Sequence, residues 1–159
     1  MFRFRIVAVL AALGAGATVV WAQNLDAIKQ RREAMREIAK AGTPPFKMSK
    51  GEIPFDLTKV QAGLKTYHEQ ASKLKLLFPE DSKTGGDTDA SPKIWAKRPE
   101  FEKAIETFIA TAKSAAETIK DEASFKAEYP KVFRSCGGCH NDTDGFSPRL
   151  ADSFKKLSQ

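Results

Sequence analysis

Apolar residues recur at steps of three and four in two long segments of the chain. In residues 56–78 they are Leu57, Val60, Leu64, Tyr67, Ala71, Leu74 and Phe78. In residues 99–119 they are Phe101, Ile105, Phe108, Ala112, Ala115 and Ile119. This spacing places each set on one face of an α-helix. Pro99 supports the start of the second helix, because proline is favoured at the first helical position.

Two further segments show the same periodicity less regularly. Residues 24–41 begin with Asn24, which can cap a helix, and are followed by Gly42, which can end one. Residues 124–142 are also predicted to be helical. Pro130 lies inside this last segment, and we expect a kink or a break there because proline lacks the amide donor of a helix interior.

The segments between these helices are rich in proline, glycine and charged residues. We expect residues 42–55 to form a connection that packs over one end of the core. Residues 79–98 are predicted to form a long loop, and a connection of this length in a small domain is often functional. Within this loop, Trp95 would either cover an edge of a bound group or pin the loop to the helices.

Four amphipathic helices joined by polar connections predict an all-α fold, an antiparallel four-helix bundle. Residues 23–159 are a suitable length for a single domain of this kind. No internal repeat and no alternating strand pattern of useful length is found in the sequence. A bundle of four helices can hold a cofactor between facing helices.

Residues 1–22 have the composition of a secretory signal peptide. Arg3 and Arg5 precede an apolar run, and the small residue Ala22 offers a cleavage position, so we expect the mature chain to start at Gln23. The alternative is a membrane anchor that is kept. The apolar run is short for a span of about 20 residues, so we favour cleavage, with no stable membrane insertion afterwards.

The charge balance of the chain excludes one large class of function. The formal net charge is +6, a mild excess of basic residues. No basic stripe is interleaved with aromatic residues, as it would be in a nucleic-acid-binding surface. We therefore expect no nucleic-acid partner.

The five residues from Cys136 to His140, Cys-Gly-Gly-Cys-His, are the motif with the clearest chemical meaning. Two thiols three positions apart with a histidine directly after the second are typical of c-type haem attachment. Each thiol can form one thioether with the haem, and the histidine can ligate the iron. The alternatives are a disulfide or redox pair of the two thiols, and half of a zinc site that includes His140. Neither explains the whole motif as well.

The position of this motif resembles that of the class II c-type cytochromes, cytochrome c′ and its low-spin relatives called cytochrome c-556. The motif lies near the C-terminus, after three predicted helices and a Pro-Lys-Ile-Trp segment, residues 92–95. Arg31 lies four residues before Met35 in the first helix. No methionine follows residue 48, which excludes the class I arrangement with its later methionine ligand.

The resemblance implies a role for five residues. Cys136 and Cys139 carry one covalent haem c, and His140 is the proximal iron ligand. Met35 is the second axial ligand of low-spin members, and Arg31 lies near a haem propionate. The neighbouring Arg32 is the competing choice for that last role. The chain departs from the family pattern four residues after the histidine, where many members carry a basic residue and this chain carries an aspartate, Asp144.

By the same resemblance, the protein is expected to be a periplasmic one-electron carrier with His/Met ligation, served by a redox partner protein, and not an enzyme. The alternative is a five-coordinate cytochrome c′ that binds nitric oxide or carbon monoxide, in which Met35 is an ordinary packing residue. Members of the family often form homodimers.

Overall fold

The computed structural model describes residues 24–140 and 145–147. Over these ranges the chain forms five α-helices and one short 3₁₀ helix, which confirms the predicted all-α fold. They are α1 (Leu25–Ser49), α2 (Leu57–Leu74), η1 (Glu80–Ser82), α3 (Lys93–Ala96), α4 (Arg98–Thr118) and α5 (Glu122–Cys136). Within the described ranges, no helix is both long and apolar enough to cross a membrane.

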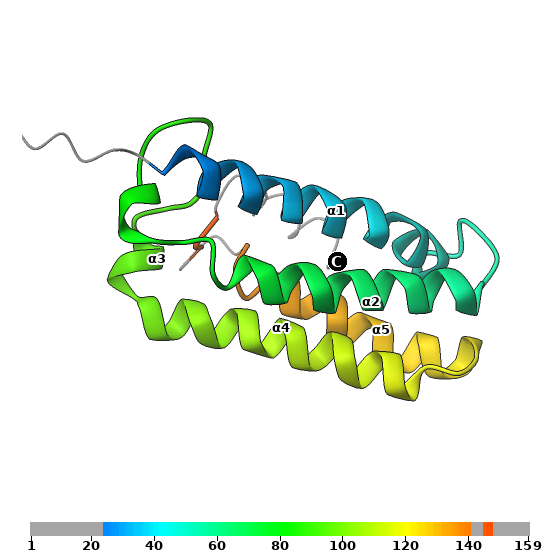
Figure 1. The fold of residues 1–159 in the computed structure, drawn as a ribbon. Helices are drawn as coiled ribbons and strands as arrows, with labels where there is room; N and C mark the ends of the chain where they lie inside the picture. The colour runs from blue at the N-terminus through cyan, green and yellow to red at the C-terminus, as the bar shows by residue number, and fades with distance from the viewer. Residues whose placement is uncertain (1–23, 141–144, 148–159) are drawn as a thin grey trace, which may run out of the picture.

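The four long helices form the antiparallel bundle that the periodicity predicts (Figure 1). Each long helix packs against the next along the chain, and α1 also contacts α5, which closes the bundle. α1 begins and α5 ends at the same end of the bundle (Figure 1). The short elements η1 and α3 lie at that end too, so the segment after α5 and the loop between α2 and α4 come together there.

The predicted connection over residues 42–55 is wrong in its first part, because α1 continues as far as Ser49. Pro44 and Pro45 therefore lie inside a helix. Pro45 is fully buried, and a Cβ atom on Gly63 of α2 would lie 3.2 Å from the Pro45 ring and 3.0 Å from a backbone carbonyl of α1. This close packing between the helices outweighs the two amide donors that the prolines lack.

The fourth predicted helix is confirmed with altered ends. α5 starts two residues earlier than expected, because the Asp121 side chain accepts a hydrogen bond from the Ser124 amide while the Ser124 side chain accepts one from the Asp121 amide. This reciprocal cap fixes the first turn. The helix continues through Pro130 without the predicted break, and it ends at Cys136. The sequence also predicts a short helical turn at residues 151–157, which lie outside the described residues.

Buried apolar side chains form two clusters. The larger core comprises Ile38, Met48, Val60, Leu64, Tyr67, Ala112, Ala115, Ile119, Phe125, Tyr129 and Val132. The smaller core comprises Phe78, Ile94, Phe101, Ile105 and Phe146. The smaller core draws on the loop between α2 and α4 and on the segment after α5, so it lies at the end of the bundle where these segments meet.

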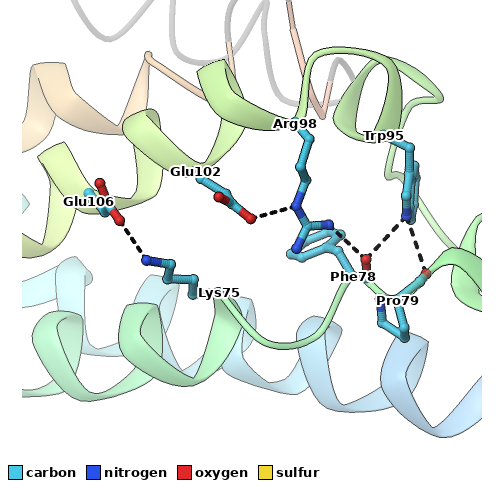
Figure 2. Close-up of polar contacts among 7 residues, drawn as sticks. All are labelled: Lys75, Phe78, Pro79, Trp95, Arg98, Glu102 and Glu106. Carbon is cyan, nitrogen blue, oxygen red and sulfur yellow. Dashed lines mark hydrogen bonds and ion pairs between the residues drawn. The ribbon is translucent and has the colours of Figure 1, made fainter.

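The segment over residues 79–98, predicted as a loop, contains η1 and α3, and hydrogen bonds to backbone carbonyls hold its two ends together. Trp95 Nε1 donates to the carbonyls of Phe78, at 3.1 Å, and Pro79, at 3.2 Å, and Arg98 donates to that of Phe78 at 2.8 Å (Figure 2). Figure 2 also shows the flanking ion pairs Arg98–Glu102 and Lys75–Glu106. These bonds support the second of the two roles expected for Trp95, that of pinning the loop.

Candidate haem site

A cavity of about 440 Å³ lies among α1, α2, α4, the 79–98 loop and the end of α5. Its apolar lining comprises Met35, Ile38, Ala39, Ala71, Leu74, Phe78, Ala90, Ile94, Phe101, Ile105, Phe108 and Phe146. Its polar lining comprises Arg31, Arg32, Arg36, Thr88, Asp89, Ser135, Cys136, Cys139, His140 and Ser147. The cavity therefore has the mostly apolar wall with a few polar groups that is typical of a cofactor site. All the site residues predicted from the sequence line this cavity: Arg31, Met35, Cys136, Cys139 and His140.

Cys136 and Cys139 are free thiols at the wall of this cavity. Burial raises the pKa of Cys136 to about 12 and that of Cys139 to about 11. Redox-active cysteine pairs have lowered pKa values instead, so the environment of these two thiols differs from that of a redox pair. In the described part of the chain, no group of three or more His, Cys, Asp or Glu residues could hold a metal ion, which disfavours the zinc alternative there.

His140 is buried beside the two thiols, with only 8% of its surface exposed. Its Nδ1 atom lies 3.1 Å from the carbonyl oxygen of Ser147. A carbonyl can only accept, so Nδ1 carries the proton and the ring's lone pair is on Nε2. Burial lowers the pKa of His140, which favours the neutral imidazole. A neutral ring with its second nitrogen held by a backbone carbonyl is the usual state of a metal-binding histidine.

Met35 lines the same cavity from α1. It is partly buried and packs against the larger core. The other candidates for a second ligand in the described ranges are placed elsewhere: Met48 is buried in the larger core, and His68, which is partly buried, does not line the cavity. The structure thus brings Met35 and His140, which are far apart in the sequence, to the wall of one cavity.

Arg31 is a buried charged residue, with 4% of its surface exposed. Its guanidinium donates to the hydroxyl of Ser82 at 2.9 Å, the carbonyl of Ser82 at 3.0 Å and the hydroxyl of Thr88 at 2.5 Å. It also lies over the Phe78 ring at 5.0 Å. Burial lowers the pKa of Arg31, but a guanidinium remains protonated in proteins, so a positive charge is held at the cavity wall.

Arg32 also lines the cavity, but its surroundings differ from those of Arg31. Its guanidinium pairs with Asp87 at 2.6 Å, and 44% of its side chain is exposed. The propionate role of either arginine stays a prediction. What the contacts add is that Arg31 anchors the 79–98 loop to α1, a role that the sequence did not indicate.

The sequence also gave no indication of a role for Asp89 and Ser147. Ser147 accepts from the His140 ring through its carbonyl and donates from its hydroxyl to the Asp89 carboxylate at 2.8 Å. Asp89 and Ser147 are separated by 58 positions in the sequence. The only available signal was the unusual length of the loop that carries Asp89.

A family model described as cytochrome C′ matches residues 26–142 of this chain. The chain belongs to the class II c-type cytochromes. A cytochrome c′ of Rhodopseudomonas palustris is 41% identical over 140 residues, which cover 88% of this chain and 94% of the relative. A cytochrome c-556 of the same organism is 34% identical over 142 residues, which cover 87% of this chain and 95% of the relative.

Solved structures of this family have the same fold as this cytochrome. The structure of a cytochrome c′ from Rhodopseudomonas palustris aligns with a TM-score of 0.71 and 44% identity over 74% of this chain and 94% of its own. A model of oxidised cytochrome c556 from that organism aligns with a TM-score of 0.65 and 31% identity over 73% of this chain and 93% of its own.

As a member of this family, the protein is a haem-binding, monohaem cytochrome, and the cavity fits that cofactor. Its wall combines two neutral thiols, a neutral imidazole, a thioether and a large apolar surface. Arg31 adds a buried cation to this wall. These donor types match the thioether links and axial ligands of c-type haem.

Proposed function

We propose that this cytochrome is a one-electron carrier in which Cys136 and Cys139 attach the haem by thioethers, and His140 and Met35 are the axial ligands. The observation that carries the proposal is that all four side chains line one cavity. Both axial candidates are supported by fixed structure, since Met35 lies within α1 and the His140 ring is held by the Ser147 carbonyl.

The residues explain how such a carrier would work. A bound haem supplies an iron atom that gains or loses one electron. His140 holds its Nδ1 proton on Ser147 and presents Nε2 as a ligand, and Met35 presents a soft thioether, which raises the reduction potential of haem iron. The apolar wall excludes water. With both ligands in place there is no position for a substrate, so we propose electron exchange with a redox partner protein and no enzymatic reaction.

The second candidate function is binding of a small gas such as nitric oxide or carbon monoxide. Two observations favour it: the apolar side chains that line the cavity together with Met35, among them Ile38 and Phe108, and the 41% identity to a protein named cytochrome c′. In that case Met35 packs beside the haem without binding the iron. The two candidate functions therefore differ in whether the sulfur of Met35 binds the iron.

The optical spectrum of the ferric protein tests the proposal. We expect a low-spin spectrum with the weak far-red charge-transfer band of His/Met ligation. In Met35→Ala the band should disappear, the iron should become high-spin and carbon monoxide should bind to the ferrous form. Met48→Ala is the matched control, because Met48 is buried in the larger core and does not line the cavity, so the band should persist. A wild-type protein that is high-spin and binds carbon monoxide would establish the gas-binding alternative.

We also propose that residues 1–22 are a signal peptide and that the mature single-domain protein, starting at Gln23, acts in the periplasm. The support is the basic and apolar pattern of this segment together with the covalent haem expected at the Cys-Gly-Gly-Cys-His motif. N-terminal sequencing of the haem-containing protein from a periplasmic extract should start at Gln23. Recovery of the uncleaved chain in the membrane fraction would support the retained anchor.

A further inference from the structure

The short segment 145–147 is bonded on two sides. On one side, the amides of Phe146 and Ser147 donate to the Cys139 carbonyl at 3.0 Å and 3.2 Å. On the other side, the Ser91 amide donates to the Phe146 carbonyl at 2.9 Å, and the Ser91 hydroxyl donates to the Gly145 carbonyl at 3.3 Å. The segment therefore connects the haem-attachment motif to the 79–98 loop.

Two side-chain bonds continue this connection to the ring of His140. The His140 Nδ1–H donates to the Ser147 carbonyl at 3.1 Å, and the Ser147 hydroxyl donates to the Asp89 carboxylate at 2.8 Å. One residue, Ser147, thus holds the imidazole with its backbone and is itself held by a carboxylate with its side chain. Asp89 and Ser147 both line the cavity, so the bonds lie at the wall of the proposed haem site and not at a remote surface.

The position of Asp89 is in turn fixed from α1. Arg31 donates to the hydroxyl of Thr88, the residue before Asp89, at 2.5 Å, and to the carbonyl of Ser82 at 3.0 Å. The Thr88 hydroxyl also accepts from the Ala90 amide at 3.3 Å. The loop on both sides of Asp89 is therefore held in place, and the carboxylate has a defined location relative to Ser147.

We propose that Asp89 and Ser147 are positioning residues for the His140 ligand, and that their hydrogen bonds lower the reduction potential of the haem. A carboxylate that accepts from Ser147 fixes the segment that accepts the imidazole proton. A firmly held acceptor at Nδ1 makes the imidazole a more basic ligand, and a more basic ligand stabilises ferric iron over ferrous iron. This inference rests on the proposed ligation of iron by His140.

The experiment compares Asp89→Ala, Ser147→Ala and their double variant in the intact haem protein. The readouts are the reduction potential and the exchange rate of the His140 Nδ1 proton, followed by proton NMR. In both single variants we expect a higher potential and roughly tenfold faster exchange, which corresponds to a loss of about 1.4 kcal/mol. The double variant should exceed the larger single effect by little, because both substitutions break the same connection.

Two further variants separate positioning from the general effect of a negative charge. Asp89→Asn retains an oxygen that can accept from Ser147, so it should restore slow proton exchange and shift the potential less than Asp89→Ala. Asp81→Asn is the charge control, since Asp81 is an exposed residue of the same loop. It should leave proton exchange as in the wild type and shift the potential by less than either alanine variant.

Several results would overturn the proposal. One is that Asp89→Ala and Ser147→Ala both keep the reduction potential and the proton exchange rate of the wild type. The others are fully additive shifts in the double variant, or a potential shift in Asp81→Asn as large as that in Asp89→Ala. If the wild-type iron lacks a histidine ligand, the proposed function and this inference fail together. If histidine ligation is present and the variants behave as the wild type, this inference alone fails.

Discussion

The two cores of the bundle differ in how they are completed. All five buried residues of the smaller core line the cavity, whereas Ile38 is the one member of the larger core that does so. Away from the cavity the larger core is filled by its own side chains, with Val60, Val132 and Ala112 fully buried. The larger core is therefore complete without a cofactor, while the packing of the smaller core depends on one.

Buried polar groups follow the same division. Among the described residues, the buried polar and charged side chains are Arg31, Ser82 and His140, and all three belong to the cavity end. The larger core holds only the phenol groups of Tyr67 and Tyr129, whose hydroxyls lie 3.4 Å apart. Polar groups buried next to the cavity are costly unless they are bonded, and here they hold the elements that carry the proposed ligands.

The largest expected effect comes from removing both attachment thiols. In Cys136→Ala/Cys139→Ala we expect the yield of haem protein to fall to a small fraction of that of the wild type, because no thioether can form. Amide hydrogen exchange of the recovered chain should be faster around Phe101 and Ile105 than around Val60 and Leu64. Uniform exchange at both ends would contradict the division between the cores, and full haem content would contradict covalent attachment.

A smaller effect is expected at Arg31. Arg31→Ala leaves the Ser82 and Thr88 acceptors without their charged donor, so we expect it to lower the free energy of unfolding by about 2 kcal/mol. It should also shift the haem potential while the spin state is unchanged. Arg32→Ala is the matched control, because its ion pair with Asp87 is exposed and such pairs contribute about 1 kcal/mol or less.

Denaturant unfolding and a redox titration of the two variants measure both effects. A potential that shifts in Arg32→Ala and not in Arg31→Ala would assign the propionate contact to Arg32. Equal stabilities of the two variants would contradict the role of Arg31 in holding the loop.

The smallest effect concerns the larger core at high pH. Burial raises the pKa of Tyr67, and it raises the pKa of Tyr129 to about 12. A group whose pKa is raised on folding contributes stability that is complete below its ordinary pKa, about 10 for tyrosine. This stability is lost as the pH rises toward the folded value. The wild type should therefore lose up to roughly 1.4 kcal/mol per pH unit between these values through Tyr129.

The double variant Tyr67→Phe/Tyr129→Phe isolates that contribution, because lysines titrate in the same range in both proteins. Thermal unfolding followed by circular dichroism from neutral pH upward should show a shallower loss of stability in the variant than in the wild type. Parallel curves for the two proteins would mean that the tyrosine pair ionises without cost and is not enclosed by the larger core.

The sequence predicted those features that depend on local spacing. The apolar steps from Leu57 to Phe78 predicted α2, although the helix ends four residues earlier, at Leu74. The Cys-Gly-Gly-Cys-His motif together with Met35 predicted the residues that share the cavity. The end of α1 was missed because Gly42, Pro44 and Pro45 are local signals for a break, and tight packing on Gly63 overrides them. The local sequence pattern does not indicate how closely two helices approach each other.

The contacts around the predicted ligands could not be read from the sequence for a related reason. Arg31 bonds to residues 46 to 57 positions away, and Ser147 bonds to a carboxylate 58 positions away. Single serine, threonine and aspartate residues in a polar loop carry no periodic signal. Their roles exist only once the loop between α2 and α4 meets the segment after α5.

X-ray absorption at the iron edge of the ferric protein tests the central claim most directly, because it detects the atoms bonded to iron. If Met35 and His140 are the axial ligands, the spectrum should contain a sulfur atom among the nearest neighbours of the iron, and Met35→Ala should remove it. Met48→Ala should leave it unchanged. A wild-type spectrum in which nitrogen atoms are the only close neighbours would contradict His/Met ligation and leave Met35 as a packing residue in a gas-binding site.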